Sequence, residues 1–253
     1  MDHLRRFGGI GRLYGSAALE RFRRTHLCVI GIGGVGSWTV EALARSAVGA
    51  LTLVDMDHVA ESNINRQLPA LESTLGRAKI EVMGERALEI NPGLELVLVD
   101  DFLTLDNLGS LMERRFDFVI DCMDNFRTKA ALIHHCKRNR QPLLTVGGAG
   151  GKSDPLRIRI SDLYRTEQDP LLARTRRLLR QEYGFSRNPR RRFQVPVVWS
   201  DEPAVQPPFS GESCEARPVG GLNCGGYGSC APVTAGFGMA AAAHVLGKLA
   251  ASI

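Results

Sequence analysis

The stretch that decides the fold runs from His26 to Gln67 and reads HLCVIGIGGVGSWTVEALARSAVGALTLVDMDHVAESNINRQ. Residues 27–30 form a short apolar run of the length of a strand, and residues 31–36 give the pattern G-x-G-x-x-G. The pattern predicts a helix over 37–47 and a second strand over 51–54. A glycine pattern in this strand–turn–helix–strand context is typical of a nucleotide-binding unit.

The glycine turn is the first candidate site. Glycines let the backbone approach a phosphate closely, and the N-terminal end of the next helix offers unpaired N–H groups and the positive end of a dipole. Asp55 ends the second strand, where it is placed to accept hydrogen bonds from a ribose. The candidate turn residues are Gly31, Gly33, Gly34, Gly36 and Ser37.

The composition is that of a globular protein with one core. The chain has 253 residues, of which 44% are hydrophobic and 23% charged, and a net charge of +5. This mild positive charge is compatible with an anionic partner without proving one. The most apolar stretch, 231–243, is shorter than the about 20 residues that span a bilayer, so we expect a buried helix and no membrane contact. No secretory signal is recognisable, and none of the six cysteines forms C-x-x-C, which indicates reduced thiols in a cytoplasmic protein.

Strands and helices alternate beyond Gln67. We expect helices over 75–90, 105–114 and 127–139 and strands over 94–99, 116–120 and 143–146. This alternation predicts an α/β, Rossmann-like, doubly wound and mostly parallel sheet. Ligands bind beyond the carboxyl ends of such strands, so Asp55, Asp121 and Asp124 should cluster beside the glycine turn.

The second half departs from the alternation and predicts an irregular C-terminal extension. It contains a strand over 156–160, an amphipathic helix over 171–183, a loop over 201–230 that is rich in Pro, Gly and Ser, and an Ala-rich helix over 234–251. Between 174 and 192 there are eight arginines and one acid, Glu182. We expect a basic arm and helix over 1–25, an ATP-binding core over 26–150, and a part of the same domain over 151–253 that faces the substrate.

Several residues favour ATP over a dinucleotide. A lone G-x-G-x-x-G most often indicates a dehydrogenase, but a dehydrogenase needs no arginine and lysine together near its nucleotide. An enzyme that splits a triphosphate does, because charge on the phosphate oxygens must be neutralised in the transition state. Asp124 would hold Mg²⁺. Taken singly, Lys79 could be a solvated helix lysine and Asp124 a helix cap. The candidates are Asp57, Asn63, Arg66, Gln67, Lys79, Asp124 and Asn125.

These motifs resemble a known family. The turn GxGGxGS, DxD, NxNRQ, the downstream lysine and DxxDN, over about residues 26–148, are similar to the adenylation domain of ubiquitin-activating-enzyme-like proteins. The resemblance implies that Asp55 binds the ribose, that Asn63, Arg66, Gln67 and Lys79 surround the phosphates, and that Asp124 positions Mg²⁺. It also implies formation of an acyl-adenylate and a homodimer.

The second half narrows the branch of this family. Activators of sulfur carriers usually bind zinc through two C-x-x-C pairs, and this chain has neither, so we expect no zinc. The stretches Arg6–Gly15, Val146–Gly151 and Gln168–Leu171 instead resemble the branch that dehydrates threonylcarbamoyladenosine in tRNA. That branch implies adenylation of the threonyl carboxylate and then ring closure. The activation of a sulfur-carrier protein remains the alternative, and NAD binding by the same turn is a third hypothesis.

Three assignments stay open at this level. The arginines of the N-terminal arm either form a solvated surface or bring Arg12 or Arg6 to a phosphate, in the same or a neighbouring subunit. The arginine-rich segment is either a solvated face or a tRNA contact made by Arg174, Arg177, Arg190, Arg191 and Arg192. Cys214, Cys224 and Cys230 are either ordinary thiols or acceptors for a cargo, and a sulfur-transfer protein is a possible partner.

Overall fold

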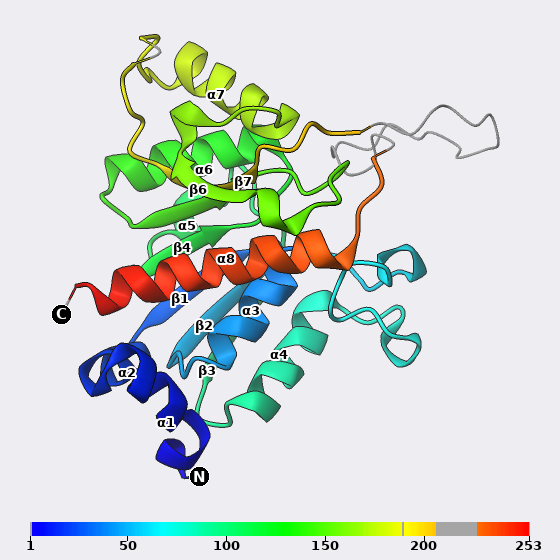
Figure 1. Ribbon diagram of the computed structural model, residues 1–253, viewed down its shortest axis with the longest axis vertical. Coiled ribbons are helices and arrows are strands. Elements are labelled where there is room, and N and C mark those ends of the chain that lie inside the picture. The colour runs from blue at the N-terminus through cyan, green and yellow to red at the C-terminus, as the bar shows by residue number, and fades with distance from the viewer. Residues whose placement is uncertain (1, 189, 206–226, 253) are drawn as a thin grey trace.

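A mostly parallel sheet forms the centre of the computed structural model, which describes residues 2–188, 190–205 and 227–252 (Figure 1). In these residues the sheet has seven strands in the order β3-β2-β1-β4-β5-β7-β6. All neighbours pair in parallel except β6 and β7, which are antiparallel. The predicted Rossmann-like fold is therefore confirmed. The strands are β1 (His26–Ile30), β2 (Ala50–Val54), β3 (Glu95–Val99), β4 (Phe118–Asp121), β5 (Leu143–Val146), β6 (Ile158–Asp162) and β7 (Pro196–Ser200).

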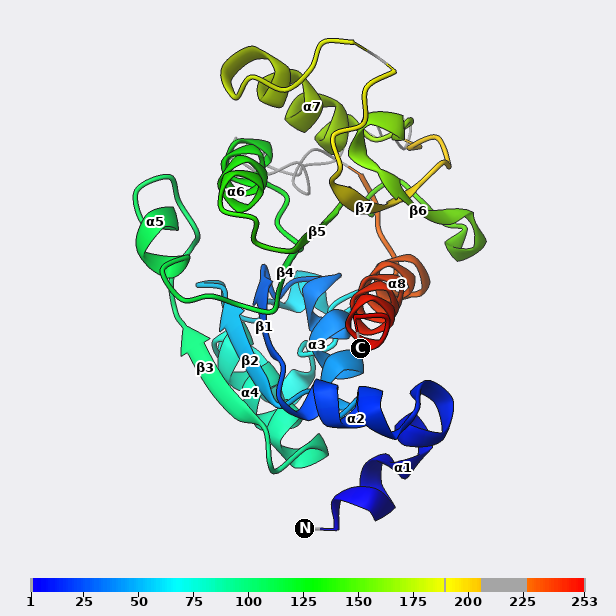
Figure 2. The ribbon, with the colours of Figure 1, turned by 90° about the vertical axis from the view of Figure 1, so that its left-hand side faces the viewer.

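Helices cover both faces of the sheet. Figure 2 shows α3 and α8 on one side of the strands and α5 and α6 on the other. Helix α4 packs against α3, and α7 packs against α6. The helices are α1 (His3–Tyr14), α2 (Ser16–Arg23), α3 (Gly36–Ala44), α4 (Lys79–Ile90), α5 (Leu108–Leu111), α6 (Phe126–Arg138), α7 (Pro170–Glu182) and α8 (Ala231–Ala250), with short 3-10 turns η1 (Glu61–Asn63), η2 (Glu72–Thr74), η3 (Pro155–Arg157) and η4 (Leu163–Arg165).

The central strand β1 divides the core into two layers. Leu27 and Val29 pack with the residues of α3 and α8, whereas Cys28 and Ile30 pack with those of α6. Successive side chains of a strand point to opposite faces. Since both faces are covered, the whole run 27–30 is buried, which explains why the sequence shows a continuous apolar stretch and not an alternation.

Several elements differ from the sequence prediction, among them α1, which is a helix where an arm was expected, and β6, which begins at Ile158 and not at 156. Helix α5 covers only Leu108–Leu111, because the Asn107 side chain bonds Thr104 N, Asp101 Oδ2 and the Phe102 carbonyl and so holds the preceding residues as a loop. Helix α4 begins at Lys79 and not at 75, since η2 and Gly76, with φ of +79°, come first. Strand β7 was not predicted.

The N-terminal residues form two helices at the amino edge of the sheet. Phe7 on α1 packs against Leu19 on α2 and Ala47. Arg6 donates to the carbonyl oxygen of Ile90 at 2.8 Å, at the C-terminal end of α4, where a cation is favourable. Helix α4 leads into β3, so this contact places α1 at the edge where the strands begin.

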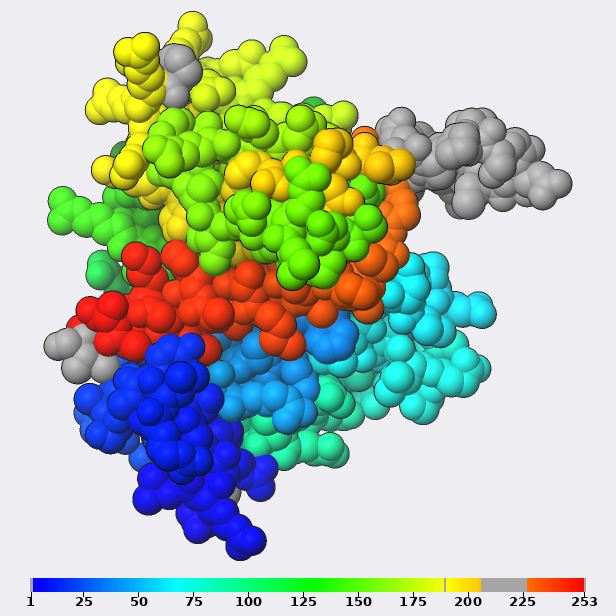
Figure 3. Space-filling view, viewed as in Figure 1, coloured from blue at the N-terminus to red at the C-terminus, as the bar shows by residue number. Residues whose placement is uncertain are grey.

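Helix α8 lies across one face of the molecule, between the N-terminal part and residues 155–205 (Figure 3). It is long and apolar enough to cross a membrane by length and composition, but half of its apolar window is buried inside the structure. The packing against α3 is close: a Cβ at Gly238 would lie 2.6 Å from the Val35 carbonyl oxygen. The expectation of a packed helix agrees with this contact, although the helix begins at Ala231 and not at 234.

Candidate active site

The carboxyl ends of β1, β2 and β4 meet beside the glycine turn. Ile30 pairs with Val54 on one side and with Asp121 on the other. Gly31 N then donates to the Val54 carbonyl at 2.9 Å, and Cys122 N donates to the Ile30 carbonyl at 2.8 Å. The turn, Asp55 and Asp121 therefore lie at one edge of the sheet, as predicted.

The turn closes so tightly that two glycines are required. Gly31 has φ of +86°, and a Cβ there would lie 3.1 Å from the Cys122 carbonyl. A Cβ at Gly36 would lie 1.8 Å from the Gly31 carbonyl oxygen, which no side chain tolerates. The N-cap residue Val35 gives α3 no side-chain cap, and Ser37 N donates to the Gly33 carbonyl at 3.1 Å, so the N–H groups of the first turn other than that of Ser37 are the ones that can meet a ligand or water.

Asp55 is held between the turn and the loop after β2. Its Oδ2 accepts from Ile32 N at 2.5 Å and its Oδ1 from Asp57 N at 2.8 Å. Burial raises the pKa of Asp55 above its ordinary value, while the two N–H groups and the charge of Lys79 oppose this shift. The carboxylate is thus held in place by one N–H group of the glycine turn and one N–H group of the loop after β2.

Lys79 points inward at the start of α4. Its Nζ lies 2.8 Å from Asp57 Oδ2, and the lysine side chain is only 5% exposed whereas that of Asp57 is 53% exposed. The backbone holds the same pair, because Lys79 N donates to the Asp57 carbonyl at 3.0 Å. Lys79 is therefore not a solvated helix lysine, which was one of the two interpretations of the sequence. Its partner Asp57 is exposed, so a ligand anion can replace Asp57 beside Lys79.

The loop 63–67 contacts the turn through two polar side chains. Ser37 Oγ donates to the Gly33 carbonyl at 2.7 Å and accepts from Leu68 N at 3.3 Å. Gln67 is buried, its Nε2 lies 3.9 Å from where a Cβ of Gly33 would be, and within the described part of the chain its Oε1 accepts no hydrogen bond. A buried acceptor without a donor costs about 1–3 kcal/mol. A ligand hydroxyl, an amine or water would satisfy it.

The other two candidate residues of this loop, Asn63 and Arg66, bond locally. Asn63 Oδ1 accepts from Ala60 N at 3.1 Å and so closes η1. Arg66 Nη1 donates to the Ser62 carbonyl at 2.7 Å, while its Cγ lies 3.6 Å from where a Cβ of Gly34 would be. The Arg66 carbonyl accepts from Trp38 and Thr234 on α3 and α8. The backbone of Arg66 is fixed, and among the described residues its guanidinium donates to two acceptors close in sequence, the Ser62 carbonyl and Asn65 Oδ1.

Asp124 lies on the loop between β4 and α6. Asn125 caps α6 by accepting from Arg127 N and Thr128 N, which is the role that the sequence allowed for Asp124. Over residues 2–188, 190–205 and 227–252 the half-buried carboxylate of Asp124 has no hydrogen bond or ion pair, and no group of three or more metal-ligating side chains is found. One free carboxylate fits Mg²⁺, which usually takes one or two carboxylates together with substrate phosphates.

A buried network that was not predicted from the sequence supports this loop. Lys129 Nζ lies 2.7 Å from Asp121 Oδ2, Thr145 Oγ1 donates to the same oxygen at 2.6 Å, and Met123 N donates to Asp121 Oδ1 at 3.1 Å. Lys129 and Asp121 are fully buried. The sequence does indicate that Lys129 is buried, because its spacing puts it on the same helix face as the apolar residues Leu132, Ile133 and Cys136.

Other candidates lie away from this edge. Arg12 is on α1, at the amino edge. Arg190, Arg191 and Arg192 are exposed and precede β7, which also places them at the amino edge, whereas Arg174 and Arg177 are exposed on α7. Among the thiols, Cys214 and Cys224 fall outside the described residues. Burial raises the pKa of Cys122 to about 12, so the thiol closest to the turn is not a nucleophile at neutral pH.

The fold and this edge define a Rossmann-like nucleotide-binding protein, and the model of one family describes nearly the whole chain. The ThiF family model matches residues 9–252. The chain belongs to the ThiF family.

Close relatives share a single name. The chain is 50% identical over 249 residues to the tRNA threonylcarbamoyladenosine dehydratase of Haemophilus influenzae, covering 98% of this chain and 94% of the relative. It is 38% identical over 191 residues to the Bacillus subtilis protein of that name, covering 76% and 72%. The crystal structure of the Escherichia coli tRNA N6-threonylcarbamoyladenosine dehydratase in complex with ATP is similar with a TM-score of 0.89 and 46% identity, covering 98% and 95%.

Proposed function

We propose that the chain is an ATP-dependent enzyme that dehydrates N6-threonylcarbamoyladenosine beside the anticodon of tRNA. The observation that supports this most is the whole-length similarity to dehydratases, one of them crystallised with ATP, combined with a carboxyl edge suited to a nucleotide. The glycine turn, Asp55, Lys79 and the unsatisfied Gln67 oxygen all belong to this edge.

The reaction follows from the chemistry of a carboxylate and ATP. An oxygen of the threonyl carboxylate attacks the α-phosphorus, and pyrophosphate leaves. Another atom of the same modified group then attacks the acyl carbon, a ring closes, and AMP leaves with one carboxylate oxygen. The second step is intramolecular, so proximity supplies much of its rate and no nucleophilic cysteine is needed.

Four side chains of the carboxyl edge have separate roles in this proposal. Asp55 accepts hydrogen bonds from the ribose, and its two backbone donors keep it oriented. Lys79 exchanges Asp57 for a phosphate oxygen, and Arg66 turns from its local carbonyl acceptor to the same charge. Gln67, with Asn63 beside it, binds the nucleotide through its amide.

Asp124 is the residue that would hold Mg²⁺. A bound Mg²⁺ neutralises negative charge on the phosphates. The Asp121–Lys129 network fixes the loop that carries Asp124, because Asp121 binds the N–H of Met123 directly before it. Asn125 serves the same loop as the cap of α6.

The N-terminal arm contributes only if two chains associate. Arg12 lies at the amino edge of its own sheet, so it would reach ATP from a partner subunit of a homodimer. We propose this arrangement for a cytoplasmic enzyme. Loss of dehydration in Arg12→Ala, restored by mixing it with a Lys79→Met chain in heterodimers, would establish a shared site. No restoration by mixing would contradict it.

The exposed arginines of α7 and of the segment before β7 provide a contact for the tRNA phosphates. Because Arg190, Arg191 and Arg192 are at the amino edge, they would bind tRNA at a distance from the reacting adenosine. Replacing the three by Gln should raise the Kd for tRNA and flatten its dependence on salt. An unchanged Kd across a salt titration would remove this contact from the proposal.

One assay tests the function itself. Purified protein is incubated with ATP, Mg²⁺ and threonylcarbamoylated tRNA, and the tRNA is digested to nucleosides for mass spectrometry. We expect the modified adenosine to lose the mass of one water. If no such product forms while a sulfur-carrier protein supports AMP formation, the alternative activity holds, and a sulfur-transfer partner would then act through a cysteine such as Cys230.

A further inference from the structure

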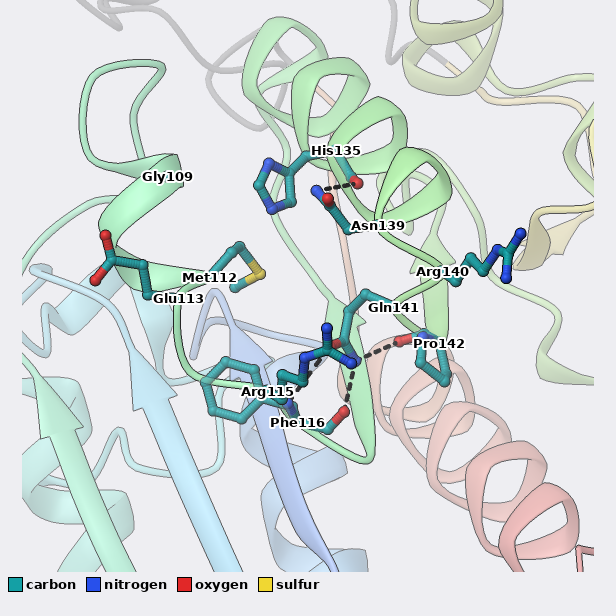
Figure 4. A pocket seen from close by; sticks show the side chains of 10 residues that line it. All are labelled: Gly109, Met112, Glu113, Arg115, Phe116, His135, Asn139, Arg140, Gln141 and Pro142. Atoms are coloured by element: carbon teal, nitrogen blue, oxygen red, sulfur yellow. Dashed lines mark hydrogen bonds between the residues drawn. The ribbon is translucent and has the colours of Figure 1, made fainter.

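A pocket lies at the edge of the sheet opposite the candidate active site. It has a volume of about 380 Å³ and lies between α5 and the C-terminal end of α6 (Figure 4). Two of its lining residues place it at the amino edge, because Pro142 directly precedes β5 and Phe116 lies two residues before β4 begins. Its wall is fixed, because Gln141 Nε2 donates to the Phe116 carbonyl at 2.7 Å and Gln141 Oε1 accepts from Phe116 N at 3.4 Å.

The lining combines flat or apolar groups with polar ones. Figure 4 shows the Met112 and His135 side chains on two sides of the pocket and the Arg115 guanidinium beside Gln141. Asn139 is held in place, since its Nδ2 donates to the His135 carbonyl at 3.0 Å. An aromatic or guanidinium plane, an amide and an apolar wall are the groups that proteins use to bind an unstacked RNA base.

The surface around the pocket carries exposed cations that form no ion pair within the described residues. Within the described part of the chain, five exposed cations of this region form no ion pair: Arg114, Arg115, Lys137, Arg138 and Arg140. Exposed arginines of the helices α2 and α3 differ, since Arg23 pairs with Glu20 and Arg45 with Glu41. Acids are also present in this region: Glu113 lines the pocket, Asp106 lies three residues before Gly109, and Asp117 pairs with Arg21. Unpaired cations on one surface favour an extended anionic partner.

The cations around the pocket continue into the arginine-rich segment. Lys137 Nζ donates to Gln194 Oε1 at 2.9 Å, which joins the end of α6 to the residues before β7. Arg190, Arg191 and Arg192 are exposed directly before that contact. The amino edge therefore carries one basic surface made of three segments of the sequence, residues 114–115, 137–140 and 190–192.

We propose that this pocket binds one unstacked nucleotide of tRNA outside the reacting position, with the flanking phosphates on Arg115 and Arg140. This inference rests on the function proposed above and adds a second tRNA contact to it. The strands between the two edges have four or five residues, a span of about 15 Å at about 3.3 Å per residue. One tRNA can reach both edges, so the pocket determines tRNA affinity and not the chemistry of the carboxyl edge.

The first test removes charge. In the full-length protein, Arg115→Gln/Arg140→Gln is compared with the control Arg23→Gln/Arg45→Gln, which removes two charges from α2 and α3. Kd for threonylcarbamoylated tRNA is measured by fluorescence anisotropy between 50 and 200 mM salt. We expect the Kd of the first variant to rise at least about tenfold and its salt slope to fall by about two, with the control within about twofold of wild type. Kd for the first variant within about twofold of wild type overturns the inference.

The second test adds a side chain to the lining of the pocket without changing charge. Gly109 lines it, and a Cβ there meets no atom within 4 Å, so Gly109→Leu enters free space and Gly109→Ala is its control. We expect Gly109→Leu to raise the Kd about tenfold with an unchanged salt slope, which is the effect of losing one stacked base. An unchanged Kd overturns the nucleotide pocket. Unaltered ATP binding shows that either variant is folded. If wild-type protein binds tRNA and dehydrates it while both variants behave like their controls, only this inference fails; if wild type does neither, the proposed function fails.

Discussion

Two lysine–aspartate pairs lie at the carboxyl edge of the sheet and differ mainly in their exposure to solvent. Lys79 and Asp57 are 2.8 Å apart, and Lys129 and Asp121 are 2.7 Å apart. Asp57 is 53% exposed, whereas both members of the second pair are fully buried. Water can replace Lys79 around Asp57, but nothing can replace Lys129 around Asp121.

The difference in exposure indicates that Lys79 can bind a ligand, whereas Lys129 stabilises the fold. A buried charge that loses its partner remains in a medium of low polarity, so the pair must stay intact for the fold to persist. A partly exposed pair contributes little to stability, and its lysine can exchange a carboxylate for a phosphate at small cost. The same residue types at the same distance thus serve two purposes, and burial decides which.

The largest effect is expected from breaking the buried pair. Lys129→Met leaves Asp121 buried with only the hydroxyl of Thr145 and a backbone N–H, which should lower the free energy of unfolding by about 3–5 kcal/mol. Urea denaturation followed by circular dichroism measures this. The double variant Lys129→Met/Asp121→Asn removes both charges and should recover much of the loss. A single variant as stable as wild type would show that the pair is not structural.

Breaking the exposed pair should affect chemistry and leave the fold unchanged. We expect Lys79→Met to lower kcat for tRNA dehydration by about 10²–10³, because a donor to developing phosphate charge is lost. Stability should change by less than about 1 kcal/mol, since Asp57 becomes hydrated. Single-turnover assays at saturating ATP and the same urea titration measure the two quantities. Loss of stability without loss of activity would reverse the assignment of the two pairs.

A smaller effect is expected from the other half of the exposed pair. Asp57→Asn keeps the backbone bond to Lys79 N but removes the charge that orients Nζ. We expect kcat to fall by about tenfold or less, because Lys79 loses preorganisation and not its charge. The steady-state rate with varied ATP measures it. A loss as large as that of Lys79→Met would mean that Asp57 itself contacts the nucleotide.

The fold could be predicted from the sequence because most strands of this sheet are marked by the residues of the strand itself. Each parallel strand buried on both faces leaves one apolar run, and Gly31–Gly36 and Asp55 mark where the first two strands end. Strand β7 was missed because it follows a long arginine-rich segment and pairs with β6 and with the distant β5. Its own apolar run over 195–199 is interrupted by Pro196, and a proline within a run disfavours its assignment as a strand.

The site was readable only in part, for a similar reason. Asp55, Lys79 and Asp124 follow motifs, so their positions could be inferred from order along the chain. The roles of Asn125 as a cap and of Asp121 as the partner of a buried lysine depend on contacts made in three dimensions. The unpaired cations of the amino edge are likewise invisible in the sequence, where a paired and an unpaired arginine look the same.

The pH dependence of ATP binding provides the finest distinction, because Asp55 lies beside the exposed pair. Burial raises its pKa above the ordinary 3.8. Only the ionised carboxylate accepts hydrogen bonds from both ribose hydroxyls, so the Kd for ATP should rise as the pH falls through this raised pKa. The free energy of unfolding depends on pH in the opposite direction. The contribution of Asp55 to stability is fully present below pH 3.8 and is lost as the pH rises through the folded-state pKa.

Weaker ATP binding at low pH should therefore occur without unfolding caused by this group. Calorimetric titration of ATP between pH 4.5 and 7.5 measures it, and Asp55→Asn should lack this acid limb, while the ionisation of ATP itself affects both proteins alike. Asp57→Asn should shift the limb to lower pH, because the charge of Asp57 is one cause of the raised pKa. If the limb stays where it is in Asp57→Asn, the charge of Asp57 is screened by solvent, and burial is what raises the pKa of Asp55 against its two N–H donors and Lys79.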